Sequence, residues 1–278
     1  MTQGRVECRG LTKMFGDEWA RQVIVERASF VVEAGQLNVM IGPSGCGKST
    51  LINLIAGYEQ ATSGEILIDG ERVQGPGRDR LVVFQETALF PWMTSLENVM
   101  FGPEVGGMNR REARQDARRL LEKVGLKGFE DKYPAQLSGG MQRRCELARA
   151  LINQPRIMLM DEPFRGLDAM TRELMQEYLL RLFEETHHTV LFVTSELEEA
   201  IFLADRLLIL TAKPTSVKQV LAVDLPRPRD FHALTSSRYA ELKQEALEAL
   251  YQEAVKAFAK GSKAAYDLVE AFGRRVSS

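Results

Sequence analysis

One glycine-rich segment constrains what this chain can fold into more than any other part of its sequence. It fits the phosphate-loop pattern G-x-x-x-x-G-K-[ST] at every fixed position. Apolar runs over 37–41 and 51–55 flank it, which predicts a strand, a loop and a helix, with a bound phosphate at the helix N-terminus. A chance match in an ordinary turn would lack this context. The predicted phosphate-binding residues are Gly42, Pro43, Ser44, Gly45, Cys46, Gly47, Lys48, Ser49 and Thr50.

Two side chains of this loop have distinct predicted roles. Lys48 supplies a positive charge to the outer phosphates of a di- or triphosphate, and the Ser49 hydroxyl can reach Mg²⁺. The loop therefore predicts a nucleotide bound together with Mg²⁺.

A second glycine-rich segment separates this chain from other phosphate-loop proteins. Its residues lead directly into a strongly helical run over 142–151. Ser138 is a good helix N-cap, and the glycines after it leave backbone amides open to an anion. Alone, such a segment would be an ordinary cap. Placed between a phosphate loop and a strand that ends in paired acids, it resembles the signature of the ATP-binding-cassette (ABC) family, LSGGQ or LSGGM; its residues are Leu137, Ser138, Gly139, Gly140 and Met141.

The resemblance implies that ATP is the nucleotide and gives roles to two carboxylates. An apolar run over 157–160 ends in Asp161 and Glu162, and ligands collect at the carboxyl ends of strands in open parallel sheets. By the family pattern, Asp161 organises Mg²⁺ through its hydration shell, and Glu162 is the general base that polarises the attacking water. Two solvated acids capping a strand are the alternative, but such a pair at the end of a buried strand is costly without a cation.

Three further positions match the family one at a time. Gln85 matches the glutamine that the family places on the metal and the water, and Asp168 lies in a segment similar to the loop that crosses to the partner subunit. Phe15 matches the aromatic residue that stacks on adenine, with Trp19 as an alternative platform. An isolated phenylalanine at this position would more often belong to the core.

One position departs from the family pattern. Where the family has a histidine that contacts the γ-phosphate, this chain has Ser195. His187 and His188 enter the strand that Ser195 leaves, so at about 3.3 Å per residue they lie roughly 20 Å away. His232 has no motif context. The hypothesis is that Ser195 still donates a hydrogen bond to the γ-phosphate, or orders a water that does. Without the histidine, we expect either slow hydrolysis or a different second subunit that brings the histidine.

Composition excludes several classes of protein. The chain has 278 residues and a formal net charge of −2, which is not the basic field of a nucleic-acid binder. Arginines cluster over 110–119 with acids interleaved, which is typical of a solvated helix face. The three cysteines have no metal-ligand spacing, and Cys46 in the phosphate loop favours a reducing cytoplasm. No apolar stretch approaches the roughly 20 residues that cross a bilayer, and the amino terminus is not a signal peptide.

The hydrophobic pattern predicts an α/β fold. We expect a P-loop NTPase core with a mostly parallel sheet over 38–60 and 155–212, an antiparallel β subdomain that begins with residues 1–36, and a helical subdomain over about 86–151.

The ABC resemblance stops short of the end of the chain. It predicts an ABC ATPase domain over 1–230 and leaves a C-terminal helical extension over 231–278, with helices over 240–259 and 263–274. The extension has three open roles, which are packing, dimerisation and regulation.

One phosphate loop and one signature per chain imply partners. In the family these two motifs belong to different subunits at each ATP, so the resemblance implies a second ATPase subunit in a homodimer. It also implies transmembrane permease subunits, a periplasmic or surface solute-binding protein, and a peripheral location on the cytoplasmic face of the inner membrane. Residues 87–94 are either a packed loop or an exposed groove for the permease. No nucleic acid is expected as a partner.

The finer resemblance concerns the transported solute. The segments 89–92, 199–206 and 224–229 are similar to importer ATPases of the nitrate, sulfonate and taurine type. Residues 161–168 and the missing histidine are similar to ATPases linked to urea- or guanidine-carboxylase pathways. An ABC protein of DNA maintenance would carry long heptad arms between the phosphate loop and the signature, and a translation-type ABC protein would repeat the cassette within one chain. This sequence has neither feature, so both classes are excluded. The alternative that stays open is a catalytically weakened regulatory subunit that binds ATP as a clamp.

Overall fold

The computed structural model describes residues 3–17 and 20–259. Trp19, the alternative adenine platform, and the predicted helix over 263–274 lie outside the described residues.

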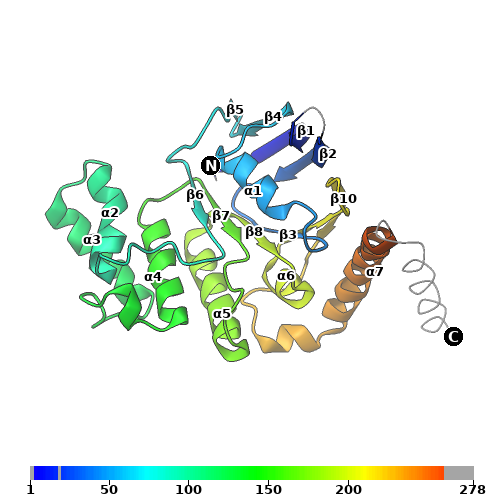
Figure 1. Ribbon diagram of the computed structural model, residues 1–278. Helices are drawn as coiled ribbons and strands as arrows, with labels where there is room; N and C mark the ends of the chain where they lie inside the picture. The colour runs from blue at the N-terminus through cyan, green and yellow to red at the C-terminus, as the bar shows by residue number, and fades with distance from the viewer. Residues whose placement is uncertain (1–2, 18–19, 260–278) are drawn as a thin grey trace.

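A six-stranded sheet forms the centre of the molecule, with the strand order β10-β9-β3-β8-β7-β6 (Figure 1). Neighbouring strands pair in parallel, except for β10, which runs antiparallel to β9. Strands such as β3 are buried along their whole length because both faces of the sheet are covered. The predicted mostly parallel core is confirmed; its strands are β3 (Leu37–Ile41), β6 (Arg80–Val83), β7 (Ile157–Asp161), β8 (Thr189–Thr194), β9 (Arg206–Leu210) and β10 (Val217–Ala222).

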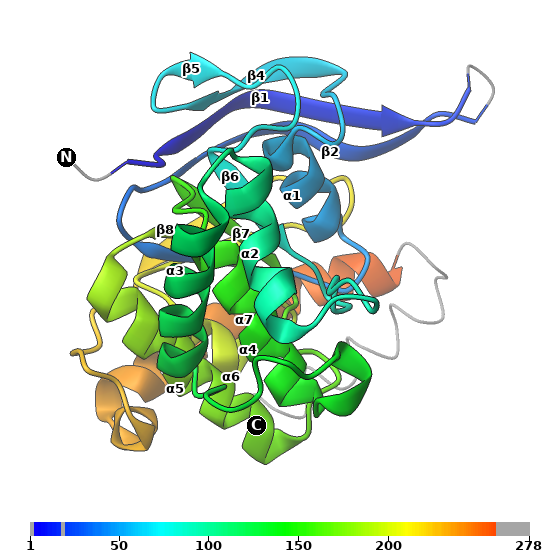
Figure 2. The same ribbon diagram turned by 90° about the vertical axis from the view of Figure 1, so that its left-hand side faces the viewer.

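A second sheet covers helix α1 (Lys48–Ala56) on one side of this core (Figure 2). Side chains of β1, β2, α1 and the central sheet share one hydrophobic cluster, so α1 is packed between the two sheets. The predicted antiparallel β subdomain is present in the order β2-β1-β4-β5. Its strands are β1 (Val6–Phe15), β2 (Gln22–Val32), β4 (Ser63–Ile68) and β5 (Glu71–Arg72).

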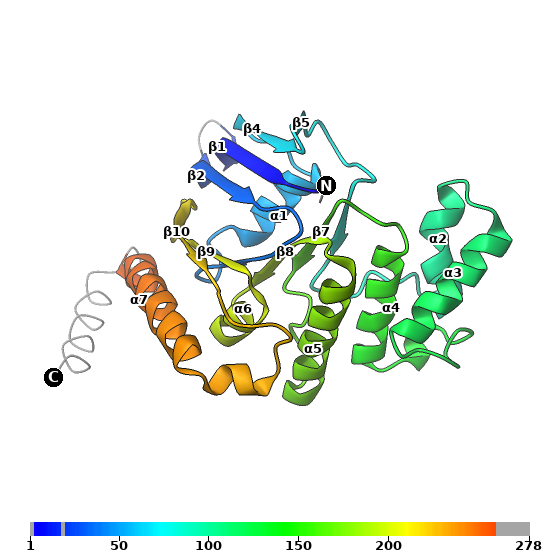
Figure 3. The ribbon, with the colours of Figure 1, turned by 180° about the vertical axis from the view of Figure 1, so that it is seen from behind.

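Four helices cover the opposite face of the central sheet (Figure 3). Apolar residues of all four join the strands in a single hydrophobic cluster. Helix α7 lies in the C-terminal extension, yet its residues Tyr239, Leu242, Ala246 and Ala249 are part of this cluster. The described part of the extension therefore packs on the core; the helices are α4 (Gly139–Leu151), α5 (Ala169–Thr186), α6 (Leu197–Leu203) and α7 (Ser237–Ala259).

Helices α2 (Ser95–Val105) and α3 (Arg110–Lys123) extend from α4 to one side of the molecule (Figure 1). The three helices have their own hydrophobic cluster. A capping box between Thr94 and Glu97 starts α2, and the run from Gln85 to Thr94 before it is not helical. The arginines of α3 are exposed, whereas Ala113, Ala117 and Leu121 are buried on its other face. This agrees with a solvated arginine face.

A buried arginine fixes the segment that joins the central sheet to η2 (Phe231–Thr235) and α7. The Arg229 side chain is 1% exposed. Its Nη1 donates to the carbonyl oxygens of Phe202 at 3.0 Å and Ala204 at 2.6 Å, at the end of α6, and its Nη2 donates to those of Val223 and Leu225. Burial lowers the pKa of Arg229 to about 10. The guanidinium therefore satisfies carbonyls that a helix end would otherwise leave without donors.

Replacing this arginine tests its structural role. We expect Arg229→Ala to lower the free energy of unfolding by about 3 kcal/mol, because several buried carbonyls lose their donors at once. Denaturant unfolding measures the change, and Arg114→Ala on the exposed face of α3 is the matched control, expected within about 0.5 kcal/mol of the parent. A loss below about 1 kcal/mol for Arg229→Ala would contradict this role.

Candidate nucleotide-binding site

The phosphate loop connects β3 to α1, as the sequence predicts. Gly47, the N-cap of α1, has φ 119°, and a Cβ there would approach Ile24 Cγ2 to 2.9 Å. Only glycine fits both the backbone and the space. Thr215 Oγ1 donates a hydrogen bond to the carbonyl of Cys46, whose side chain is buried and whose pKa is raised by that burial. The loop is therefore held against its neighbours by contacts within the protein.

Lys48 connects this loop to the acidic end of β7. Its Nζ donates to the carbonyl oxygens of Gly42 at 2.9 Å and Pro43 at 3.2 Å. The same nitrogen lies 4.0 Å from Glu162 Oε1, and Lys48 is only 6% exposed. The two motifs that lie far apart in the sequence thus meet around one ammonium group.

The two acids after β7 have different surroundings. Burial raises the pKa of the Asp161 carboxyl, and the Ser49 hydroxyl beside it lowers the pKa by a smaller amount. Glu162 has φ 43°, a left-handed backbone conformation that is uncommon for a residue with a side chain. Its amide donates to the Val193 carbonyl at 2.9 Å, which holds this conformation against β8. Its Oε2 accepts a hydrogen bond from Arg165 Nη1 at 2.8 Å.

Gln85 lies just after β6 with an exposed side chain. Arg143 on α4 holds the backbone here: it donates to the carbonyls of Phe84 at 2.7 Å and Gln85 at 2.6 Å. Glu146, one turn along, pairs with Arg143 at 2.5 Å and accepts from the amide of Ala88 at 3.1 Å. Burial raises the pKa of Glu146 and lowers that of Arg143. Sequence reasoning missed this pair, since opposite charges three residues apart are common on exposed helix faces.

The signature segment begins α4. Ser138 is the N-cap, and its Oγ accepts from the amide of Met141 at 3.3 Å, as predicted. A Cβ on Gly140 would approach Thr171 Cγ2 on α5 to 2.8 Å, so the glycine allows the two helices to lie close together. Asp168 caps α5, with its Oδ1 accepting from the amide of Thr171 at 3.0 Å. A groove of about 360 Å³ between α4 and α5 includes Ser138, Gly140 and Met141.

Ser195 is exposed directly after β8. The neighbouring Thr194 donates to buried Glu199 at 2.5 Å, which fixes the end of the strand. His187 caps the end of α5. It precedes β8 and Ser195 follows it, so the two residues lie at opposite ends of this strand, as the sequence predicts. Phe15 ends β1 with 40% of its surface exposed, and Lys13 Nζ lies 4.6 Å from its ring centroid. Phe15 is thus partly exposed, with the Lys13 ammonium group over its ring.

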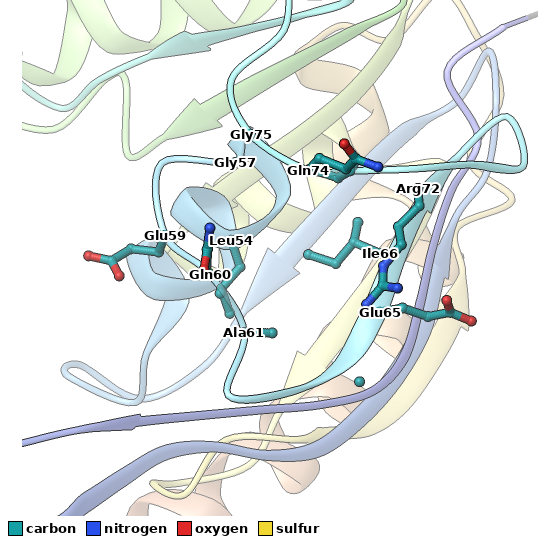
Figure 4. Close-up of a pocket in the computed structure, with 12 residues that line it drawn as sticks. Leu54, Gly57, Glu59, Gln60, Ala61, Glu65, Ile66, Arg72, Gln74 and Gly75 are labelled. Atoms are coloured by element: carbon teal, nitrogen blue, oxygen red, sulfur yellow. The ribbon is translucent and has the colours of Figure 1, made fainter.

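A separate cavity of about 300 Å³ lies beside Gly57, which caps the carboxyl end of α1 (Figure 4). Lys48 begins the same helix, and nine residues at 1.5 Å each separate the two ends by about 13 Å. Gln60 and Arg72 are among the side chains around it. This cavity is therefore distinct from the site at the phosphate loop.

Comparisons with known proteins identify the family. The family model described as "ABC transporter" matches residues 25–165. The chain belongs to the ABC transporter family. It is 44% identical over 252 residues to an uncharacterized ABC transporter ATP-binding protein of Methanocaldococcus jannaschii, covering 91% of this chain and 93% of that protein.

Two relatives have names that include a solute. The chain is 42% identical to the nitrate import ATP-binding protein NrtD of Synechococcus elongatus, covering 88% of this chain and 90% of that one. It is 40% identical to the aliphatic sulfonates import ATP-binding protein SsuB of Bacillus cereus, covering 87% and 94%.

Solved ABC cassettes have the same fold. A dimeric ATP-binding cassette in a post-hydrolysis state with ADP and Pi has a TM-score of 0.68 and 30% identity, and covers 78% of this chain and 98% of its own. The predicted family and α/β P-loop fold are confirmed. As an ABC transporter ATP-binding chain, this protein is an ATP hydrolase.

Neutralising Asp161 tests its electrostatic position. Because burial raises the pKa of this carboxyl above its ordinary value, ionisation near pH 7 favours the unfolded chain, and this cost disappears below the pKa of the unfolded state. We expect Asp161→Asn to raise the Tm in EDTA at pH 7 above that of the parent, as measured by thermal unfolding. Mg²⁺-dependent ATP hydrolysis is expected to be lost.

Exposed Asp131 provides the control for this experiment, because Asp131→Asn removes a negative charge that is already in water. Its Tm is expected to stay within about 0.5 °C of the parent. A lower Tm for Asp161→Asn in EDTA would show that the carboxylate stabilises the nucleotide-free fold.

Proposed function

We propose that this chain is the ATP-hydrolysing subunit that powers a bacterial ABC importer for a small polar solute, either nitrate-, sulfonate- or taurine-like or urea- or guanidine-like. The observation that carries the proposal is the 4.0 Å approach of Lys48 Nζ to Glu162 Oε1. It joins a phosphate-binding cation to a carboxylate that can receive a proton from water. The import names of the similar NrtD and SsuB proteins support the direction of transport.

The site residues have separate proposed roles around MgATP. Lys48 and the phosphate-loop amides bind the phosphates, and Glu162 polarises the attacking water. Ser49, Asp161 and Gln85 offer oxygen ligands for Mg²⁺, which typically uses one or two carboxylates together with substrate phosphates. When bound, Mg²⁺ would neutralise phosphate charge. The Ser49 hydroxyl beside the partly desolvated Asp161 fits such a cation. Phe15 stacks on the adenine.

A second copy of the chain completes the site in this proposal. The signature residues at the start of α4 would bind the ATP held by the partner's phosphate loop. Asp168 would lie in the loop that crosses to the partner subunit. The dimeric state of the similar cassette structure supports this arrangement. Two chains related by a two-fold axis would form two equivalent sites.

Residues 87–94 are the proposed docking surface for the permease. Trp92 is 69% exposed, and the centroids of the Trp92 and Phe90 rings are 5.5 Å apart. The Phe90 ring in turn contacts the ring of Phe101. Buried Asn98 fixes this loop, because its Nδ2 donates to the carbonyls of Phe90, Met93 and Thr94. Leu89 of the same segment is buried, so one part of the segment packs on the protein while Trp92 is exposed. A rigid loop with an exposed aromatic residue suits a protein partner.

The remaining proposals concern location and organisation. No helix within residues 3–17 and 20–259 has the length and apolar character needed to cross a membrane. We place the chain at the cytoplasmic face of the inner membrane, with separate permease subunits and a periplasmic or surface solute-binding protein. We also propose that the chain consists of an ATPase domain over 1–230, with its helical lobe over about 86–151, and a C-terminal extension over 231–278.

The second candidate is a regulatory subunit that binds ATP as a clamp. Neutral Ser195 at the end of β8 favours it, because a serine cannot bring the positive charge that a histidine can. Glu162 opposes it, since a clamp needs no general base.

Trapping nucleotide tests the dimer. We expect Glu162→Gln to bind MgATP without rapid hydrolysis and to sediment as a dimer at saturating MgATP. The control adds Gly139→Asp, whose carboxylate repels the phosphate from the signature and leaves the protein monomeric. A monomeric Glu162→Gln protein in saturating MgATP rules out the shared site.

Restoring the histidine tests the clamp alternative. We expect Ser195→His to raise the kcat for ATP by about 10- to 100-fold, because a preorganised donor to the γ-phosphate is regained. Steady-state phosphate release is the measurement, made with and without the copurified permease. Unchanged turnover in Ser195→His would show that this position does not limit hydrolysis. A parent chain that hydrolyses no ATP even with the permease would support the regulatory clamp.

A further inference from the structure

Arg165 lies in the turn between β7 and α5, three residues after Glu162. Its backbone amide donates to the Glu162 carbonyl at 3.1 Å, which closes the turn. Its Nη1 lies 2.8 Å from Glu162 Oε2. The Arg165 side chain is 60% exposed, whereas the Glu162 side chain is only 12% exposed. A surface cation therefore reaches into the site and bonds to a nearly buried carboxylate.

The two oxygens of this carboxylate have different partners. Oε2 bonds to Arg165, and Oε1 faces Lys48 Nζ at 4.0 Å. Lys48 is held by the phosphate loop, so Oε1 points toward the place where the phosphates would lie. The arginine is bonded to the carboxylate oxygen that does not face Lys48. Such a charge-assisted bond fixes the rotation of the carboxylate without blocking Oε1.

Local charge explains why such a bond would be needed. Asp161 precedes Glu162 directly, and a bound triphosphate adds further negative charge beside both acids. Ser195, at the end of the adjacent strand, is neutral. Repulsion would displace the Glu162 side chain, and the hydrogen bond from Arg165 to Oε2 limits the positions that the side chain can take.

We propose that Arg165 is a positioning residue for ATP hydrolysis, holding Glu162 by Oε2 so that Oε1 faces the attacking water. This rests on the proposed role of Glu162 as general base. The water oxygen bonds to the γ-phosphorus while the bond from that phosphorus to the β,γ-bridging oxygen breaks. The electron pair stays on ADP, and the water proton goes to Oε1. Arg165 neither gives nor takes a proton.

The first experiment separates catalysis from binding. With the purified full chain and MgATP, we expect Arg165→Ala to lower kcat by about 10- to 100-fold, because a misplaced catalytic group is costly. The KM for ATP is expected to stay within about twofold, since the phosphate loop is intact. Arg165→Lys, which keeps the charge, is expected to recover at least a third of the parent kcat. Loss of kcat below twofold in Arg165→Ala would overturn the proposal.

A control and a double variant exclude a structural role. Arg119→Ala breaks an ion pair with the same three-residue spacing, formed with the more exposed Asp116 on α3, and is expected to keep the parent kcat. In a Glu162→Gln background, Arg165→Ala is expected to cause no further loss in single-turnover hydrolysis, because the two residues act as a unit. Multiplying losses in the double variant would mean that Arg165 acts independently of Glu162.

The outcomes also separate this inference from the proposed function. An active parent with an equally active Arg165→Ala variant rejects the positioning role alone. A Glu162→Gln variant with parent turnover rejects the general base and the positioning role together.

Discussion

Parallel pairing of β3, β7 and β8 is the constraint on which the candidate site depends. Ile41 lies beside Thr194, and Asp161 lies beside Val193, in one continuous hydrogen-bonded register. The residues that follow each strand therefore leave the sheet at the same edge. This places the phosphate loop, the second acid and the serine side by side, although up to about 150 residues separate them along the chain. Two-sided burial of these strands keeps the register fixed.

Charge balance at this edge follows from that register. Lys48 is shared between loop carbonyls and Glu162, while Asp161 relies on a neutral hydroxyl from Ser49. The site thus has a partly desolvated carboxyl with a raised pKa near a buried ammonium. A bound cation would neutralise the Asp161 carboxylate, and bound phosphates would neutralise the Lys48 ammonium group. Arg165 offsets the same excess of negative charge from outside, which links a solvent-exposed side chain to the proposed chemistry.

The segment after β6 connects the nucleotide edge to the helices beside it. Arg143 and Glu146 bind the backbone of residues 84–88 to α4, and Gln142 adds a contact with Thr87. The signature at the start of α4 and the loop that carries Gln85 are therefore held by one helix. The pair of Arg143 and Glu146 is buried, so breaking these contacts would leave a charge without its partner.

Local patterns in the sequence determined the strand–loop–helix of the phosphate loop, the Ser138 cap and the alternation of a parallel core, since each depends on neighbours within a few residues. The family resemblance added the expected roles of Asp161, Glu162 and Gln85. Tertiary structure alone decided that Arg143 and Arg229 are buried, that α7 joins the main hydrophobic cluster, and that Arg165 turns back onto Glu162. Charged residues carry no local sign of burial, because their partners are backbone carbonyls and side chains that only the folded chain brings together.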